Sequence, residues 1–165
     1  MLDKGISNPV ALFHFSVSSS RTFPEDKIKE WFYDSKEQYV IFGSESDERK
    51  AEEMIANNKN ISMKSFCGKY DLRKSVALIA VCNYVIAADS GLGHISSVLG
   101  IPTVSFFGAG RSSVTKPIGK YNVVIDKSTR CKPCKKNICC LNAIKKSDVN
   151  YAIRSLQIDS KFEVQ

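Results

Sequence analysis

The chain has 165 residues, 43% of them hydrophobic and 25% charged, and its formal net charge is +7. These values indicate one globular domain with its own core, and they exclude a disordered chain. No apolar run approaches the roughly 20 residues of a membrane span and no signal pattern opens the chain, so we expect a cytoplasmic protein. The basic excess attracts polyanions, but no aromatic residues interleave with the basic run at 130–136, so nucleic acid is not an expected partner.

Apolar runs and segments of helical periodicity alternate along the chain. Continuous apolar runs of this length are typical of strands buried on both faces of a parallel sheet. The predicted strands span 9–15, 39–42, 61–66, 84–88, 103–107 and 122–125. The predicted helices span 24–33, 46–57, 71–81, 92–99 and 147–157. The alternation predicts an α/β fold with a Rossmann-like, doubly wound parallel sheet.

Residues typical of helix starts support the first three of these helices. Pro24 opens the first helix, Ser46 or Asp47 is expected to cap the second, and Asp71 is expected to cap the third. The stretch from 108 to about 146 is predicted to be irregular apart from one short strand. We therefore expect a single domain over residues 1–165, with a cysteine-rich irregular segment at about 128–146.

Ligands of doubly wound sheets bind beyond the carboxyl ends of the strands. The residues that follow the first five predicted strands therefore matter most. Four of these five segments contain glycine, and the first is a serine cluster, which is a pattern typical of a phosphate-bearing ligand. The segments are 14–21, 43–46, 67–70, 89–94 and 108–113.

The segment Asp89-Ser-Gly-Leu-Gly-His94 is the most informative of these. Its two glycines let the backbone turn sharply from strand into helix, and the free amides of a helix start favour an anion. Ser90 and His94 supply further donors for the same phosphate. The alternative is a plain strand-to-helix turn with a capping aspartate.

A dinucleotide-binding fingerprint is a superficial rival for the same residues. Gly91 and Gly93 match its first two glycines, but Ser96 stands at the third. The fingerprint also expects an acidic residue at the end of the next strand, where this chain has Gly-Ala-Gly-Arg, and the turn follows a late strand instead of the first. A dehydrogenase is therefore not expected.

The stretch from Asp89 to Gly108 (DSGLGHISSVLGIPTVSFFG) resembles the signature of glycosyltransferase family 9, the ADP-heptose transferases of lipopolysaccharide assembly. Further stretches agree with that family in the same order, and the match covers about residues 9–157. They are FHFS at 13–16 with RTFP at 21–24, VIFG at 40–43, CGK at 67–69, and CKPC at 131–134 followed by Cys140-Leu141.

The resemblance implies the C-terminal, donor-binding half of a GT-B glycosyltransferase. Its ligand would be a nucleotide-diphosphate sugar such as ADP-heptose, transferred to a lipopolysaccharide or protein acceptor. The family's N-terminal domain, which holds the acceptor and contributes the catalytic base, is not in these residues, so the chain is expected to be inactive alone. Two departures from the family pattern, Ser16 for its usual Gly and Phe23 for its Trp, affect the first loop.

Chemistry assigns roles to the site residues. The departing nucleoside diphosphate needs stabilisation of its negative charge. No Asp-x-Asp metal-binding pair is present, so no cofactor is expected for catalysis and amides and cations must act instead. Asp89 is expected to shape the turn or to hold sugar hydroxyls, and His14 to be a core or strand-end residue. The predicted donor-binding residues are Ser16, Arg21, Gly43, Asp89, Ser90, Gly91, Gly93 and His94, with Arg21 closing over the diphosphate and with Arg111 and Ser112 flanking the pocket.

The cysteines divide into two groups. Cys67 and Cys82 stand singly in apolar surroundings and are expected to be small core residues. The remaining four crowd into ten residues, where a structural zinc or iron site, reduced thiols and disulfides all remain open. These candidate metal ligands are Cys131, Cys134, Cys139 and Cys140.

A binding module without catalysis is the main alternative function: a split or fragmentary transferase subunit that holds a nucleotide or docks on a separate acceptor subunit. The expected partners are thus a nucleotide-diphosphate sugar and an acceptor-binding domain or subunit. If the acceptor is a lipopolysaccharide, part of the +7 charge would face an anionic membrane, and the protein would be peripheral at the inner face of the inner membrane.

Overall fold

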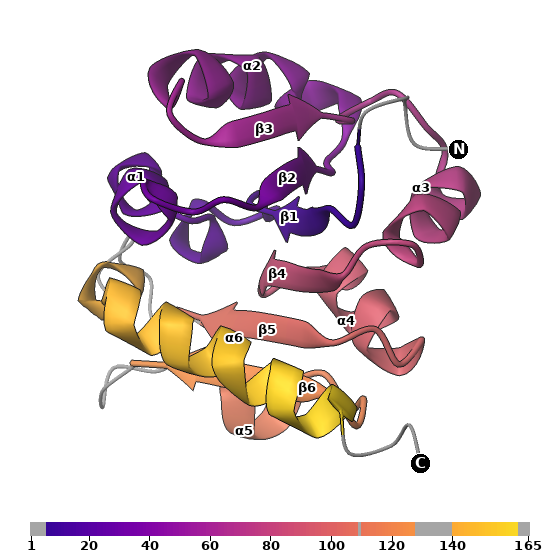
Figure 1. Ribbon diagram of the computed structural model, residues 1–165, viewed down its shortest axis with the longest axis vertical. Coiled ribbons are helices and arrows are strands. Elements are labelled where there is room, and N and C mark those ends of the chain that lie inside the picture. The colour runs from indigo at the N-terminus through magenta and orange to yellow at the C-terminus, as the bar shows by residue number, and fades with distance from the viewer. Residues whose placement is uncertain (1–5, 109, 128–139, 162–165) are drawn as a thin grey trace.

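The computed structural model describes residues 6–108, 110–127 and 140–161 (Figure 1). Six strands form one parallel sheet in the order β3-β2-β1-β4-β5-β6. The predicted Rossmann-like, doubly wound sheet is confirmed, with every predicted strand present. The strands are β1 (Val10–Phe13), β2 (Gln38–Ile41), β3 (Ser62–Ser65), β4 (Tyr84–Ala88), β5 (Thr103–Phe107) and β6 (Asn122–Asp126).

All five predicted helices are present as well, and short helical turns precede three of the longer elements. The α-helices are α1 (Glu25–Phe32), α2 (Glu48–Asn57), α3 (Leu72–Ile79), α4 (Gly91–Val98), α5 (Ser112–Thr115) and α6 (Lys146–Lys161). The 3-10 turns are η1 (Ser19–Arg21), η2 (Glu45–Asp47) and η3 (Leu141–Ala143). Within the described ranges, no helix is long and apolar enough to cross a membrane.

Helix α5 was missed, because four residues of sequence SSVT carry no apolar periodicity that could mark a helix. A tertiary contact holds it instead, since the Ser112 hydroxyl donates a hydrogen bond to the Asp126 carboxylate at the end of β6. The expected caps also differ in part. Asp71 accepts the N–H of Lys74 at 2.8 Å as predicted, whereas the Asp47 carboxylate accepts the N–H of Ser44 at 2.9 Å and gives α2 no side-chain cap.

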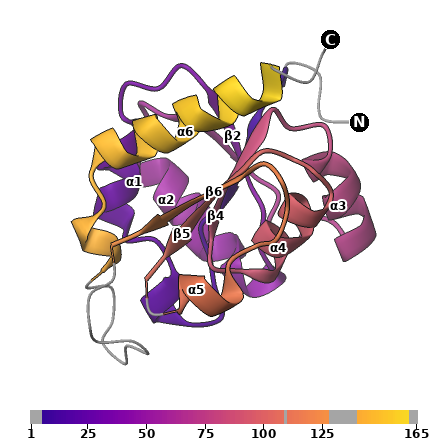
Figure 2. The same ribbon diagram turned by 90° about the horizontal axis from the view of Figure 1, so that it is seen from below.

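The sheet is buried on both faces because successive side chains of a strand point to opposite sides. On β1, Val10 and Leu12 belong to the core cluster formed with α1, α2 and α6. Ala11 and Phe13 belong to the second cluster, which contains residues of α3 and, at its edge, Leu92 of α4. Figure 2 shows α1, α2 and α6 on one side of the strands and α3 and α4 on the other. The continuous apolar runs of the sequence thus follow from burial on both faces.

Trp31 on α1 contacts residues that lie far from it in the sequence. Its ring is 2% exposed and packs edge-on against Phe106 of β5, with ring centroids 4.9 Å apart. Its indole N–H donates to the carbonyl of Ile144 at 3.1 Å, so the segment that leads into α6 is fixed against α1. Cys67 and Cys82 are buried as expected, and burial raises the pKa of their thiols to about 11 and about 12.

His14 directly follows β1 and is a core residue, which is one of the two placements predicted for it. It is 3% exposed and packs edge-on against Phe15 and Phe23, with centroid distances of 4.5 and 5.8 Å. Its Nδ1 has no hydrogen-bond partner among the described residues. Burial lowers the pKa of His14 to about 4, and the charge of Asp47 opposes this shift only in part. The ring is therefore neutral near pH 7.

This lowered pKa predicts a loss of stability in mild acid. Between the unfolded pKa of 6.5 and the folded pKa of about 4, the unfolded chain binds a proton at His14 that the native chain does not, so the free energy of unfolding falls as the pH falls. Between about pH 7.5 and about pH 5 the expected loss is about 2 kcal/mol. Urea unfolding of wild type and His14→Phe at both pH values measures it, because Phe removes the titration and keeps an aromatic ring. An equal pH dependence in the two proteins would contradict the assignment.

Candidate functional site

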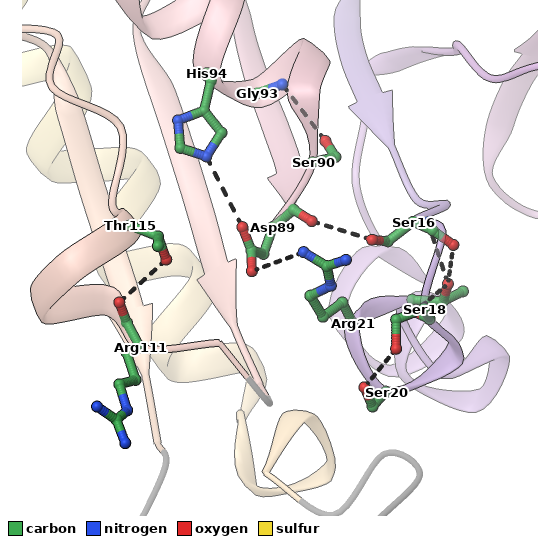
Figure 3. A network of polar contacts seen from close by, with 11 residues as sticks. Ser16, Ser18, Ser20, Arg21, Asp89, Ser90, Gly93, His94, Arg111 and Thr115 are labelled. Atoms are coloured by element: carbon green, nitrogen blue, oxygen red, sulfur yellow. Dashed lines mark hydrogen bonds and ion pairs between the residues drawn. The ribbon is translucent and has the colours of Figure 1, made fainter. Parts of the chain in front are cut away.

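The strand order reverses between β1 and β4, and the connections that leave these two strands run to opposite sides of the sheet. The loop after β1 and the turn after β4 nevertheless meet at the carboxyl edge (Figure 3). The Ser16 hydroxyl donates to the carbonyl of Asp89 at 3.1 Å, and the Arg21 guanidinium lies 3.4 Å from its carboxylate. The structure thus brings three of the predicted site residues together across the switch point.

Asp89 is the centre of this arrangement. Its side chain is 7% exposed, and a buried carboxylate requires partners. Arg21 approaches Oδ2, and Nε2 of His94 lies 3.8 Å from Oδ1 (Figure 3). A Cβ atom at Gly110 would lie 2.5 Å from Oδ2, so only glycine leaves room for the carboxylate on that side. Asp89 is therefore held between two basic side chains, which favours a shaping role over a free carboxylate.

The two glycines at the start of α4 do different work. A Cβ at Gly93 would lie 2.8 Å from Cβ of Ala87, so this glycine permits close packing of the helix on β4. A Cβ at Gly91 would have no neighbour within 4 Å, so packing does not require glycine there. The space in front of Gly91 is open on the ligand side of the turn.

The first amides of α4 are also divided between two uses. Ser90 is the N-cap: its hydroxyl accepts the N–H of Gly93 at 3.4 Å, and its carbonyl accepts that of His94 at 3.2 Å. Within the described part of the chain, the N–H groups of Gly91 and Leu92 have no acceptor. Ser90 and Gly93 thus complete the helix start, and the open donors are the amides of Gly91 and Leu92. Sequence reasoning missed Leu92, because its side chain carries no polar signal.

A cavity of about 750 Å³ lies in front of these amides, and we call it the switch-point cavity. Phe13, Phe42 and Leu72 are among its apolar lining residues, and Lys50 of α2, which the sequence analysis did not single out, adds a cation. Six of the eight predicted donor-binding residues line it: Ser16, Arg21, Gly43, Asp89, Ser90 and Gly91. Gly93 is buried behind the turn and does not line it.

His94 lines a second cavity of about 650 Å³, which we call the α5 cavity. Arg21 and Asp89 line both cavities, so their ion pair lies at the junction. The predicted flanking residue Arg111 lines the α5 cavity together with Thr115 and Lys116. Ser112, the other predicted flanking residue, lines neither cavity, since its hydroxyl bonds to Asp126.

The predicted metal ligands are only partly described. Cys131, Cys134 and Cys139 lie outside the described residues, and Cys140 is buried where the chain enters η3. In the described ranges, no group of three or more His, Cys, Asp or Glu side chains is placed to hold a metal ion. A structural zinc or iron site at these cysteines stays a prediction.

The arrangement suits an anion with an apolar neighbour. In many proteins, open amides at the positive end of a helix dipole bind phosphate oxygens. Here Arg21 and Ser16 line the same cavity as the two open amides. The apolar wall next to them suits a flat ring. A nucleotide carries both an anionic phosphate and a flat ring.

Comparison with known proteins identifies the family. The model of the family described as "Glycosyltransferase family 9 (heptosyltransferase)" matches residues 4–145 of this chain. Lipooligosaccharide heptosyltransferase 2 of Campylobacter jejuni is 30% identical over 133 residues, which cover 72% of this chain and 41% of that protein.

Two solved structures share the fold. E. coli ADP-heptose lipopolysaccharide heptosyltransferase II superposes with a TM-score of 0.81 at 21% identity, covering 96% of this chain and 49% of that one. The iron-containing dodecameric glycosyltransferase TibC from enterotoxigenic E. coli superposes with a TM-score of 0.68 at 17% identity, covering 95% and 47%. The chain therefore spans about half the length of the proteins it resembles. With a match over residues 4–145 and a relative at 30% identity, this chain belongs to glycosyltransferase family 9.

Proposed function

We propose that this chain is the donor-binding domain of a heptosyltransferase-like enzyme and holds an ADP-linked sugar in the switch-point cavity. The observation that carries the proposal is the pair of open amides, Gly91 and Leu92, in a cavity that also holds Arg21. A diphosphate on these amides would replace the hydrogen bonds that the helix start leaves unmade. The absence of a side chain at Gly91 lets phosphate oxygens approach the backbone.

Arg21 is suited to follow the charge of the ligand. Its guanidinium is 35% exposed, and its 3.4 Å contact with Asp89 is longer than the 2.7–2.9 Å usual for a charge-assisted hydrogen bond. If Arg21 turned toward a diphosphate, it would therefore lose a weak contact and gain a stronger one. Cleavage of the sugar–phosphate bond leaves a nucleoside diphosphate with growing negative charge, and a cation at this place would stabilise it.

The rest of the cavity fits the nucleoside. Leu72, which is 61% exposed, offers an apolar surface to a base, and about 750 Å³ lies within the range of cofactor-sized sites. E. coli ADP-heptose lipopolysaccharide heptosyltransferase II is an ADP-heptose transferase by its name, which supports an ADP-linked, heptose-like sugar as the donor. A sugar on the second phosphate would begin at Asp89 and His94, where their side chains can contact its hydroxyls.

The acceptor side lies beyond these residues. The C. jejuni and E. coli heptosyltransferases named above are lipooligosaccharide and lipopolysaccharide enzymes by their names, and this chain spans about half of their length. We therefore propose that acceptor binding and the catalytic base come from a second domain or subunit, and that the acceptor is a lipopolysaccharide-type molecule at a membrane surface.

Replacing Arg21 tests the diphosphate site. Arg21→Gln should weaken ADP binding by about 1–3 kcal/mol and leave adenosine binding unchanged, since only ADP carries the charge that Arg21 contacts. Calorimetry with both ligands measures this, with Arg154→Gln as a control that removes an exposed arginine of α6. Because Arg21 also neutralises Asp89, the melting temperature of each variant is recorded. Equal losses for ADP and adenosine would make Arg21 a scaffold residue and contradict the proposal.

A second prediction concerns the 165 residues by themselves. We expect them to bind ADP and to release no heptose onto a lipopolysaccharide acceptor, because they match only about half of a transferase. An assay with ADP-heptose follows ADP release with and without acceptor. Acceptor-dependent ADP release by these residues alone would contradict the division of labour proposed here.

A further inference from the structure

Two of the basic residues that line the α5 cavity are not used by the proposed binding of ADP. Its volume is about 650 Å³, and its lining includes Arg111 and Lys116 from the ends of α5. Both side chains are exposed, and within the described part of the chain neither has an ion-pair or hydrogen-bond partner. The guanidinium of Arg111 extends away from Asp89 (Figure 3).

The one carboxylate in this lining lies where the α5 cavity borders the switch-point cavity. Asp89 is 7% exposed and has Arg21 near Oδ2 and His94 near Oδ1, whereas the guanidinium of Arg111 extends away from it. The hydroxyl of Thr115 is also engaged, as it donates to the carbonyl of Arg111 at 3.1 Å. The wall of the cavity beyond Asp89 therefore presents positively charged donors and few acceptors. Such a wall favours a ligand group that only accepts hydrogen bonds, as a carboxylate or a phosphate does.

The position of the cavity identifies what would enter it. Arg21 and Asp89 line both cavities, so the α5 cavity begins where the switch-point cavity ends. A diphosphate on the amides of Gly91 and Leu92 would direct its sugar toward this junction. A sugar there, or an acceptor sugar that meets it, would place its substituents against Arg111 and Lys116.

We propose that the α5 cavity binds an anionic group, a carboxylate or a phosphate, carried by a sugar substrate. This inference rests on the proposed function for the position of the sugar. The anionic sugar is either the donor's own sugar or the acceptor residue that approaches it. In both cases Arg111 and Lys116 are specificity-determining residues, which select a charged sugar over its neutral counterpart.

Two matched pairs of probes distinguish these sources. Glucose 6-phosphate and glucose are titrated against the protein with and without saturating ADP, and ADP-glucuronic acid is compared with ADP-glucose. We expect the anionic member of one pair to bind about tenfold more tightly, the effect of a single charge-assisted contact. Preference within the free pair assigns the site to the acceptor, and preference confined to the nucleotide-linked pair assigns it to the donor.

The variant Arg111→Gln/Lys116→Gln should abolish this preference and leave ADP affinity unchanged. The control Lys29→Gln/Arg154→Gln removes the same charge from exposed positions on α1 and α6, which line neither cavity, and should keep the preference. No preference in either pair, or a preference equally lost in both double variants, would overturn the inference. Failure of ADP to bind wild type would instead contradict the proposed function, and the free pair without ADP still decides the inference.

Discussion

The pairing of β1 with β4 is the constraint on which the candidate site depends. It is the hydrogen-bonded junction between the two halves of the sheet, and the chain leaves these strands toward opposite edges. Both strands are fully buried, so neither can shift without exposing a core face. The first polar residues beyond them are thereby fixed opposite one another. Asp89, buried at the end of β4, obtains its counter-charge from Arg21 in the other half, and Ser16 adds a hydrogen bond across the same gap.

From this junction two different uses of glycine follow. Gly93 brings α4 against β4, where a Cβ would collide with Ala87, and so sets the direction in which the helix dipole points. Gly91 keeps the space before the first amides open. The combination places the proposed anion site between an apolar wall and a basic second cavity. One turn of six residues therefore connects the packing of the sheet to the proposed binding of a nucleotide sugar.

Much of this was predictable from local patterns. Burial on both faces makes the strands of a parallel sheet continuously apolar, and the turn from Asp89 to His94 has the composition of an anion site. The succession of strands and helices, the fold class and the edge of the sheet that carries the candidate site were therefore all visible in the sequence. The pairing of Asp89 with Arg21 was not, because no local pattern reports a contact between residues so far apart along the chain. The hydroxyl of Ser90 turned inward to Gly93, and His94 faces Asp89 and the second cavity, since caps and ion pairs compete with ligands for the same groups. The Ser112 hydroxyl anchors helix α5 to Asp126, and a four-residue polar segment gives no sign of this contact in the sequence.

A crystal structure of the protein with ADP tests the central claim most directly. The account predicts that the diphosphate lies within hydrogen-bond distance, about 2.7–3.2 Å, of the amide nitrogens of Gly91 and Leu92, with the Arg21 guanidinium turned from Asp89 toward a phosphate oxygen. The adenine ring should lie against Leu72. A diphosphate bound at Arg111 and Lys116, with the amides of α4 left open, would contradict it.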